Sequence, residues 1–296
     1  MKSAITCILN GKSGSQNEAA VRAAVARFAA EYGREARIIL ASGKDLEAVA
    51  RKAAETGGVV AAGGGDGTIS AVAAAVVDSQ ATLGVLPLGT LNHFAKDMGI
   101  PLDLDDAVRT VFTGSEMRVD VGEVNGRIFV NNSSVGFYPH IVRARDQQQR
   151  RGTPKWLAFA QAVLRVARRK ITVQVWLEGD GQGAHKIDTP FVFVGNNQYT
   201  LTGTEIGTRA RLDGGTLWLC TAPAAGRAKL LRLAIGALFG QADANELTRL
   251  ELRNLQIHTH HRSLLVARDG EVGVMQTPLK YRIWPRALRV LVPTQG

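Results

Sequence analysis

A glycine-rich run at residues 59–68 constrains this chain more than any other feature. The apolar segment 59–62 leads into Gly63-Gly64-Gly65-Asp66-Gly67-Thr68. Glycines let the backbone turn sharply and bring its N–H groups close to an anion, and a helix beginning near Thr68 adds its positive end. Because Asp66 repels phosphate, a cation is expected between them. The run therefore predicts a nucleotide-phosphate site with Mg²⁺ bridging Asp66 and the phosphate oxygens.

The spacing excludes the two commonest glycine-rich nucleotide motifs. A dinucleotide fingerprint that starts at Gly63 needs a sixth-position glycine, where Thr68 stands. A Walker A loop that ends with Gly11 and the following Lys-Ser pair needs a glycine five positions earlier, where Thr6 stands. A tight turn without a ligand is the remaining alternative, but such a turn rarely needs three consecutive glycines and another after an acid.

A second segment repeats this pattern of strand, polar turn and helix. The apolar run Leu83-Gly84-Val85-Leu86 leads into Pro87-Leu88-Gly89-Thr90-Leu91-Asn92, and a helix is expected to start at Thr90 or Asn92. In a parallel sheet, two such turns lie at the same carboxyl edge, which is where ligand sites of α/β proteins form.

The periodicities predict an α/β plus all-β fold in two domains. In residues 1–118, apolar runs alternate with alanine-rich helical patterns, which is typical of a doubly wound parallel α/β domain. In residues 119–280, short strands are separated by turn signals such as Asn125-Gly126, which predicts an antiparallel β-sandwich. Within it, a strand is expected over 252–258, and Asn131-Asn132-Ser133-Ser134 is interpreted as a loop that faces the cleft and touches the molecule that accepts a phosphoryl group.

Composition favours a cytoplasmic enzyme. Both cysteines, Cys7 and Cys220, lie in apolar, strand-like runs and are interpreted as buried thiols of a reducing compartment. Residues 1–9 resemble a strand rather than a signal peptide, and the chain has no run of about 18 apolar residues that would span a membrane.

The charge predicts anionic partners. The chain carries 36 Lys and Arg against 26 Asp and Glu, a formal charge of +10. Nine of the basic residues lie between Arg143 and Lys170, beside the apolar segment 156–160, which suits a helix on an anionic membrane surface. A helix packed in the core is the alternative. Nucleic acid is not expected as a partner, because aromatic residues make up only 6% of the chain and no reading motif is present.

Together, these motifs resemble the diacylglycerol kinase and sphingosine kinase superfamily, especially its soluble bacterial lipid kinases. The matching segments extend over nearly the whole chain: 64–68, 87–92 and, more loosely, 10–14, then 131–136, 194–197 and 268–271. The resemblance implies transfer of the γ-phosphate of ATP, with Mg²⁺, to the hydroxyl of a diacylglycerol-like lipid at a membrane surface. It also implies that the C-terminal segment 281–296 returns to the first domain.

The resemblance also assigns the site residues. The nucleotide is expected to be bound by Asn10, Ser13, Gly14, Gly64, Gly65, Asp66, Gly67, Thr68, Gly89, Thr90 and Asn92. Asp269 or Glu271 is expected to orient or deprotonate the lipid hydroxyl, while Asp66 holds the triphosphate through Mg²⁺. The family's structural magnesium site falls at Asp213, in an imperfect match to its turn. An Asp-Gly pair is also a common hairpin turn, so a structural role is the alternative for Asp269.

The chain departs from the family pattern at several positions, of which His93 and Gly11 lie in or beside the matching motifs. His93 stands where the family has Asp, and an imidazole is a poor magnesium ligand. Gly11 stands where the family has Pro. Two other functions stay open: an NAD kinase, which shares the Gly-Gly-Asp-Gly motif, and a regulatory protein that binds lipid or nucleotide without turnover. The sequence leaves open the acceptor lipid and the oligomeric state, including a homodimer.

Overall fold

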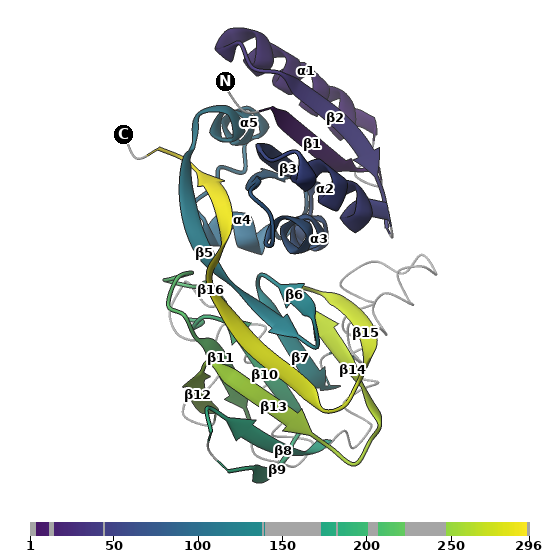
Figure 1. The fold of residues 1–296 in the computed structure, drawn as a ribbon, viewed down its shortest axis with the longest axis vertical. Coiled ribbons are helices and arrows are strands. Elements are labelled where there is room, and N and C mark those ends of the chain that lie inside the picture. The colour runs from purple at the N-terminus through teal and green to yellow at the C-terminus, as the bar shows by residue number, and fades with distance from the viewer. Residues whose placement is uncertain are drawn as a thin grey trace. The chain divides into compact units, whose positions relative to one another are not determined.

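The computed structural model describes residues 4–11, 15–43, 45–137, 139, 173–181, 183–200, 207–222 and 247–294 (Figure 1). The chain divides into two units. Unit 1 comprises Met1–Val121 and Trp284–Gly296, and unit 2 comprises Gly122–Ile283.

Unit 1 contains a parallel sheet in the order β2-β1-β3-β4. The end of β16 continues this sheet, where Val290 pairs with Leu83 in a parallel register. The strands β3 and β4 are buried along their whole length, as expected for a sheet that is covered on both faces. The strand bounds are β1 (Ile5–Asn10), β2 (Ala36–Ala41), β3 (Val59–Gly64), β4 (Thr82–Pro87) and β16 (Leu279–Val292).

Helices cover both faces of this sheet. Ile5, Cys7 and Leu9 of β1 share one core with α1 and α5, whose Phe28 and Phe112 rings stack 6.1 Å apart. Ile8 alternates with those residues along the strand and is fully buried on the opposite face. The helices α2 and α3 pack against each other. The helix bounds are α1 (Ser15–Tyr32), α2 (Asp45–Glu55), α3 (Asp66–Val76), α4 (His93–Asp97) and α5 (Leu104–Thr113). The predicted doubly wound α/β fold is confirmed.

Unit 2 is an antiparallel sandwich, also as predicted. One sheet has the order β12-β11-β10-β7-β14-β15, and the other places β13 between β16 and β8, with β9 next to β8. Apolar residues of both sheets, such as Val192 and Ile257, form one core. The bounds are β5 (Ser115–Val124), β6 (Arg127–Phe129), β7 (Asn132–Gly136), β8 (Val173–Gly179), β9 (His185–Thr189), β10 (Phe191–Asn196), β11 (Leu217–Thr221), β12 (Thr248–Leu252), β13 (Asn254–His258), β14 (Ser263–Arg268) and β15 (Glu271–Gln276).

Three local expectations were wrong. The helix α3 begins at Asp66 rather than near Thr68. The segment 252–258 is two strands, because Arg253 interrupts it and β12 and β13 belong to different sheets. Residues 132–134 belong to strand β7 rather than to a loop. Their polar side chains suggested a loop, but the buried Ser133 hydroxyl is satisfied by the Ala267 carbonyl and the Tyr281 hydroxyl.

Two expectations concern segments outside the described residues. The basic and apolar segment 143–170, a candidate membrane-binding helix, lies entirely outside them, and so do Ser13 and Gly14 of the predicted nucleotide site. Within the part of the chain that is described, no helix is long and apolar enough to cross a membrane.

Candidate functional site

The first glycine-rich turn joins β3 directly to α3. Gly65 precedes the helix, and its carbonyl accepts hydrogen bonds from the N–H groups of Thr68 and Ile69. A Cβ atom at Gly64 would lie 2.5 Å from Thr68 Oγ1, so only glycine fits there. Because the helix begins at Asp66, the free N–H groups of its first turn belong to the glycine-rich run itself. The turn can therefore offer backbone donors to an anion.

The second turn, after β4, is closed by Asn92. This buried residue has a left-handed conformation (φ 51°) and precedes α4. Its Oδ1 accepts a hydrogen bond from the Gly89 N–H at 3.0 Å, and its Nδ2 donates to the carbonyls of Gly89 and Pro87 at 2.9 and 3.3 Å. Of the two predicted helix starts, Asn92 is confirmed. The asparagine is therefore required to shape the turn.

The two turns touch each other. A Cβ atom at Gly89 would lie 2.5 Å from the Cα of Gly65, so the two backbones are in direct contact. The Phe94 N–H donates to Asp66 Oδ1 at 3.2 Å, which joins α4 to the first turn. From the end of β1, Asn10 Nδ2 donates to Thr68 Oγ1 at 3.0 Å. The structure thus brings these predicted site residues together at one edge of the sheet.

The surroundings of the Asp66 carboxylate fit a role as one ligand of a magnesium ion. Its side chain is only partly buried, and Oδ2 accepts no hydrogen bond from the described residues. The described residues contain no group of three His, Cys, Asp or Glu side chains that could hold a metal alone. Magnesium in kinase sites is typically held by one or two carboxylates together with substrate phosphates, so this donor set fits. Thr90 and His93 are exposed beside the second turn.

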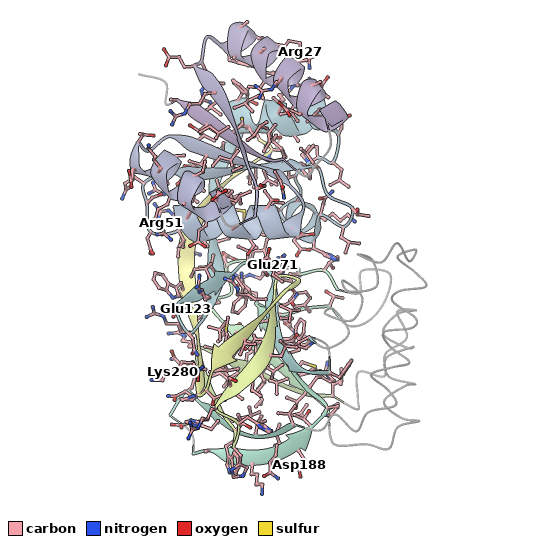
Figure 2. All side chains as sticks on the ribbon, turned by 90° about the vertical axis from the view of Figure 1, so that its right-hand side faces the viewer. Arg27, Arg51, Glu123, Asp188, Glu271 and Lys280 are labelled. Carbon is pink, nitrogen blue, oxygen red and sulfur yellow. The ribbon has the colours of Figure 1, made fainter. Side chains whose placement is uncertain are left out.

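In unit 2, Asp269 and Gly270 form the hairpin turn between β14 and β15. Both residues have positive φ angles, 46° and 84°, as a type I′ turn requires, and Arg268 pairs with Glu271 across it. Glu271 is exposed at the start of β15 (Figure 2). The hairpin therefore presents Glu271 to solvent on a rigid support.

The Asp269 carboxylate points inward and is only 7% exposed. It accepts hydrogen bonds from three consecutive backbone N–H groups, those of Val130, Asn131 and Asn132, at 2.8–3.1 Å. These three donors occupy both carboxylate oxygens, which leaves little of the group to take a proton from a substrate. Asp269 thus serves as an anchor between two segments that are far apart in sequence.

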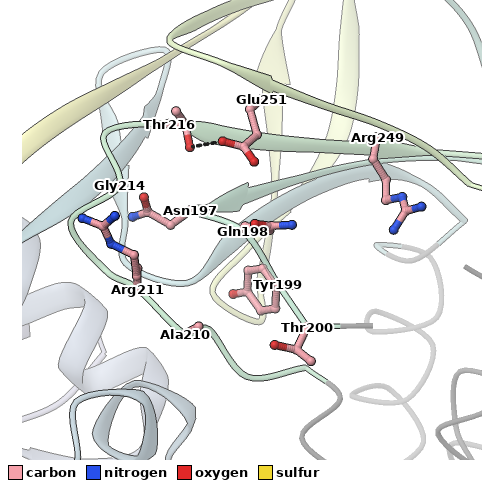
Figure 3. A pocket seen from close by; sticks show the side chains of 10 residues that line it. All are labelled: Asn197, Gln198, Tyr199, Thr200, Ala210, Arg211, Gly214, Thr216, Arg249 and Glu251. Atoms are coloured by element: carbon pink, nitrogen blue, oxygen red, sulfur yellow. Dashed lines mark hydrogen bonds between the residues drawn. The ribbon is translucent and has the colours of Figure 1, made fainter. Parts of the chain in front are cut away.

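Asp213, the predicted ligand of a structural metal, directly precedes Gly214, which lines a cavity of about 500 Å³ (Figure 3). Its Oδ1 accepts hydrogen bonds from Nε and Nη2 of Arg211, both at 3.2 Å. A guanidinium thus occupies one of the oxygens that a metal would need, and a metal at Asp213 stays a prediction. The cavity has a largely polar lining: Asn197, Gln198, Tyr199, Thr200, Ala210, Arg211, Gly214, Thr216, Arg249 and Glu251.

Sequence reasoning missed one residue of this region, Arg209. Its side chain is 4% exposed and donates to Asn131, inside the segment that Asp269 holds. No motif surrounds this arginine, and a single basic residue in a basic chain gives no signal. Only the structure distinguishes it from the exposed arginines.

Comparison with known proteins identifies both halves of the chain. The family described as "Diacylglycerol kinase catalytic domain" matches residues 4–124, and the family described as "YegS C-terminal NAD kinase beta sandwich-like domain" matches residues 134–292. A protein from Pseudomonas aeruginosa named "Probable lipid kinase YegS-like" is 29% identical, over 99% of this chain and 95% of its own length.

Two further relatives agree with this result. A protein of the same name from Klebsiella pneumoniae is 46% identical over 28% of this chain and 29% of its own length. A crystal structure of a diacylglycerol kinase from Bacillus anthracis covers 99% of this chain and 98% of its own, with a TM-score of 0.74 and 20% identity. At that identity, the structural likeness shows the fold alone.

Proposed function

Since the chain belongs to the lipid kinase family that joins a diacylglycerol kinase catalytic domain to a YegS C-terminal domain, we propose that it transfers the γ-phosphate of Mg-ATP to the hydroxyl of a diacylglycerol-like lipid. The observation that carries this proposal is the contact between the glycine-rich turn at 63–68 and the turn at 87–92, beside Asp66. Where the two turns meet, backbone N–H donors, a helix N-terminus and one available carboxylate lie together.

Unit 1 supplies the nucleotide half of the reaction. The turn at 64–68 offers backbone N–H groups to the phosphates, and Gly89 permits the close approach of the second turn. Asp66 would hold Mg²⁺, which neutralises phosphate charge when it is bound. Asn10 fixes the Thr68 side chain at the same edge. Phosphoryl transfer depends mainly on positioning and charge neutralisation, so this set of groups is sufficient.

Unit 2 supplies the group that accepts the proton. The exposed Glu271 carboxylate takes the proton of the lipid hydroxyl as the hydroxyl oxygen bonds to the γ-phosphorus. The bond from that phosphorus to the β,γ-bridging oxygen breaks, and ADP leaves. Asp269 holds the hairpin that carries Glu271. The two carboxylates that the sequence did not distinguish thus receive different roles in this proposal.

The reaction is proposed to occur at an anionic membrane surface on the cytoplasmic side. A formal charge of +10 attracts the protein to acidic lipids, each basic residue near the surface contributing about 1 kcal/mol. A peripheral enzyme could then reach a lipid hydroxyl without a membrane-spanning segment.

Transfer of labelled γ-phosphate from ATP tests the proposal. Mixed micelles would present diacylglycerol, a sphingoid base and phosphatidylglycerol, each with Mg²⁺. The matched variants are Asp66→Asn and Asp78→Asn, which make the same change near opposite ends of α3; Asp78 is exposed. A labelled lipid that is lost with Asp66→Asn and kept with Asp78→Asn supports the proposal. ATP binding without transfer to any lipid contradicts it.

NAD is the second candidate acceptor, because the family that matches residues 134–292 is described as NAD kinase-like. NAD therefore belongs in the same assay as a soluble comparator. Label in NAD alone would replace the lipid kinase with an NAD kinase.

A further inference from the structure

A buried arginine contacts the backbone segment that holds the Asp269 turn. Arg209 is 4% exposed, and its Nη1 donates to the carbonyls of Val130 and Asn196 at 2.7 and 3.1 Å. Its Nη2 donates to Asn131 Oδ1 at 2.8 Å. The guanidinium also lies over the ring of Tyr199, 5.5 Å from the centroid. Each of these contacts fixes the position of a charged group that is expensive to bury.

The same backbone segment meets a buried anion through its N–H groups. The N–H groups of residues 130–132 donate to Asp269, while the Val130 carbonyl and the Asn131 side chain accept from Arg209. The Asn132 carbonyl also accepts from the Asp269 N–H at 2.9 Å. The segment thus lies between a cation and an anion, and its polarised peptide groups connect the two.

Asn196 adds further hydrogen bonds on the side of the segment that contacts Arg209. It is fully buried, its Nδ2 donates to the Val130 carbonyl at 2.9 Å, and its backbone N–H donates to the Asn131 carbonyl. The Val130 carbonyl therefore accepts from both Asn196 and Arg209. Two buried donors on one carbonyl leave the segment 130–132 little freedom to move.

We propose that Arg209 is a positioning residue for phosphoryl transfer: it fixes segment 130–132, which fixes Asp269 and, through the hairpin, Glu271. The inference rests on the proposed function, because it needs Glu271 to be the proton acceptor. Asp269 and Gly270 are the two residues of the hairpin turn, and Glu271 follows them as the first residue of β15. A shift of segment 130–132 therefore moves the start of β15.

Arginine is the side chain that this site requires. The guanidinium donates from two nitrogens in a fixed plane to acceptors on three residues. A lysine at this position would keep the charge but not the planar fork, and methionine would keep much of the volume without any donor. The two substitutions thus separate charge from geometry.

The experiment compares Arg209→Met and Arg209→Lys with the control Arg282→Met. Arg282 also lies in unit 2 and bonds to Glu123 at 2.7 Å, but its side chain is 54% exposed. Steady-state kinetics would give kcat for the lipid and KM for ATP. Hydrogen exchange measured by mass spectrometry would report on peptides that contain 128–134 and 266–272.

The proposal expects a loss confined to kcat. A displacement of the proton-accepting carboxylate by about 1 Å costs about 100-fold in rate, so Arg209→Met should lower kcat by that order. The KM for ATP should stay within about two-fold of the wild-type value. Arg209→Lys should fall between this variant and the wild type, and Arg282→Met should match the wild type. Exchange should increase in the peptides 128–134 and 266–272 but not in the glycine-rich turns of unit 1.

Two results would overturn the proposal: a folded Arg209→Met with unchanged kcat, or unchanged exchange in both peptides. If Arg209→Met does not fold, Asn131→Ala removes a single acceptor of the guanidinium and replaces it in the same comparison. Wild-type protein that transfers no phosphate to lipid would overturn the proposed function instead, and the exchange data would still test the network. The two failures are therefore distinguishable.

Discussion

Asp66 in unit 1 and Asp269 in unit 2 are both aspartates in glycine-containing turns next to a strand, yet their carboxylates are used differently. Asp66 is partly exposed and accepts a hydrogen bond from the Phe94 N–H. Asp269 is 7% exposed and accepts from three backbone N–H groups. The comparison shows that the same residue type can be left available for a ligand or committed to the fold. Neighbouring glycines do not decide which of the two applies.

Replacing Asp66 should have the largest effect on activity. Asp66→Asn keeps the size of the side chain but removes the charge that would hold Mg²⁺, so kcat/KM should fall by at least about 100-fold. Stability should change little, because the Phe94 N–H can still bond to the amide oxygen. Kinetics and thermal melting measure the two effects. Equal activity losses in Asp66→Asn and Asp78→Asn would show that the Asp66 carboxylate has no special role in activity, and the contrast with Asp269 would fail.

Glu271 and Asp269 should separate activity from stability. Glu271→Gln removes the proposed proton acceptor at an exposed position, so kcat should fall by about 100-fold with the melting temperature unchanged. Steady-state kinetics and thermal melting of the same preparation measure the two effects. Full activity of Glu271→Gln would remove this residue from the mechanism.

Asp269→Asn should instead lower stability, and kcat should fall only through displacement of the hairpin that carries Glu271. One of the carboxylate oxygens becomes an NH₂ group that faces a backbone N–H, which leaves buried donors unsatisfied and costs about 1–3 kcal/mol or more. Urea unfolding measures this loss, with Asp188→Asn, at an exposed position in β9 of the same unit, as the control. A variant that is as stable as the wild type but inactive would show that Asp269 acts in the chemistry.

Gly89→Ala tests the contact between the two turns. The added Cβ would lie 2.5 Å from Gly65 Cα and 2.8 Å from Asn92 Oδ1, so the turns must separate. Such overpacking costs about 1–3 kcal/mol, and KM for ATP should rise. The control is Gly183→Ala, where an added Cβ meets no atom within 4 Å. If Gly89→Ala left both stability and KM unchanged, close contact between the turns would not matter for nucleotide binding.

The smallest expected effect is a difference in reaction rate between the two cysteine thiols, one in each unit. Burial raises the pKa of Cys7 in unit 1 to about 12 and that of Cys220 in unit 2 to about 11, with Arg249 opposing the rise at Cys220. At pH 8 both thiols should react with a disulfide reagent far more slowly in the native protein than in urea, and Cys220 should react before Cys7. Faster labelling of Cys7 would contradict this order.

The same pKa values fix the sign of a pH effect on stability. Each thiol keeps its proton to a higher pH in the folded protein than in the unfolded chain, whose thiols titrate near the ordinary value of 9.0. The free energy of unfolding should therefore fall as the pH rises from about 9 toward 11–12, and the thiols should contribute no change below about pH 8. Urea unfolding of Cys7→Ala and Cys220→Ala between pH 8 and 11 checks this slope, which should be weaker in each variant.

The first glycine-rich turn could be predicted because its signal is local. Strand, glycines, acid and helix are consecutive in the chain. The one difference is that α3 begins at Asp66, two residues before the expected start near Thr68. The rule that parallel strands end at one edge of the sheet predicted that the two turns lie at the same edge, but not that Gly89 contacts Gly65. The role of Asn92 in closing its own turn gave no signal beyond a preference for helix N-termini.

The network of unit 2 could not be predicted, because its members are far apart in sequence. Asp269 meets Val130 across 139 positions, and Arg209 meets the same residue across 79. The buried serines of β7 resembled a loop because the sequence does not show that Ser133 has partners in β14 and β16. Polarity predicts exposure only where no distant group satisfies the hydrogen bonds.

Hydrogen exchange with and without Mg-ATP tests most directly the central claim that the paired turns of unit 1 hold the nucleotide. The account predicts slower exchange in peptides that contain 63–68 and 87–94, no change in the peptides around 130–132, and no protection in Asp66→Asn at the same nucleotide concentration. Protection confined to unit 2, or the same protection in Asp66→Asn as in the wild type, would contradict the account.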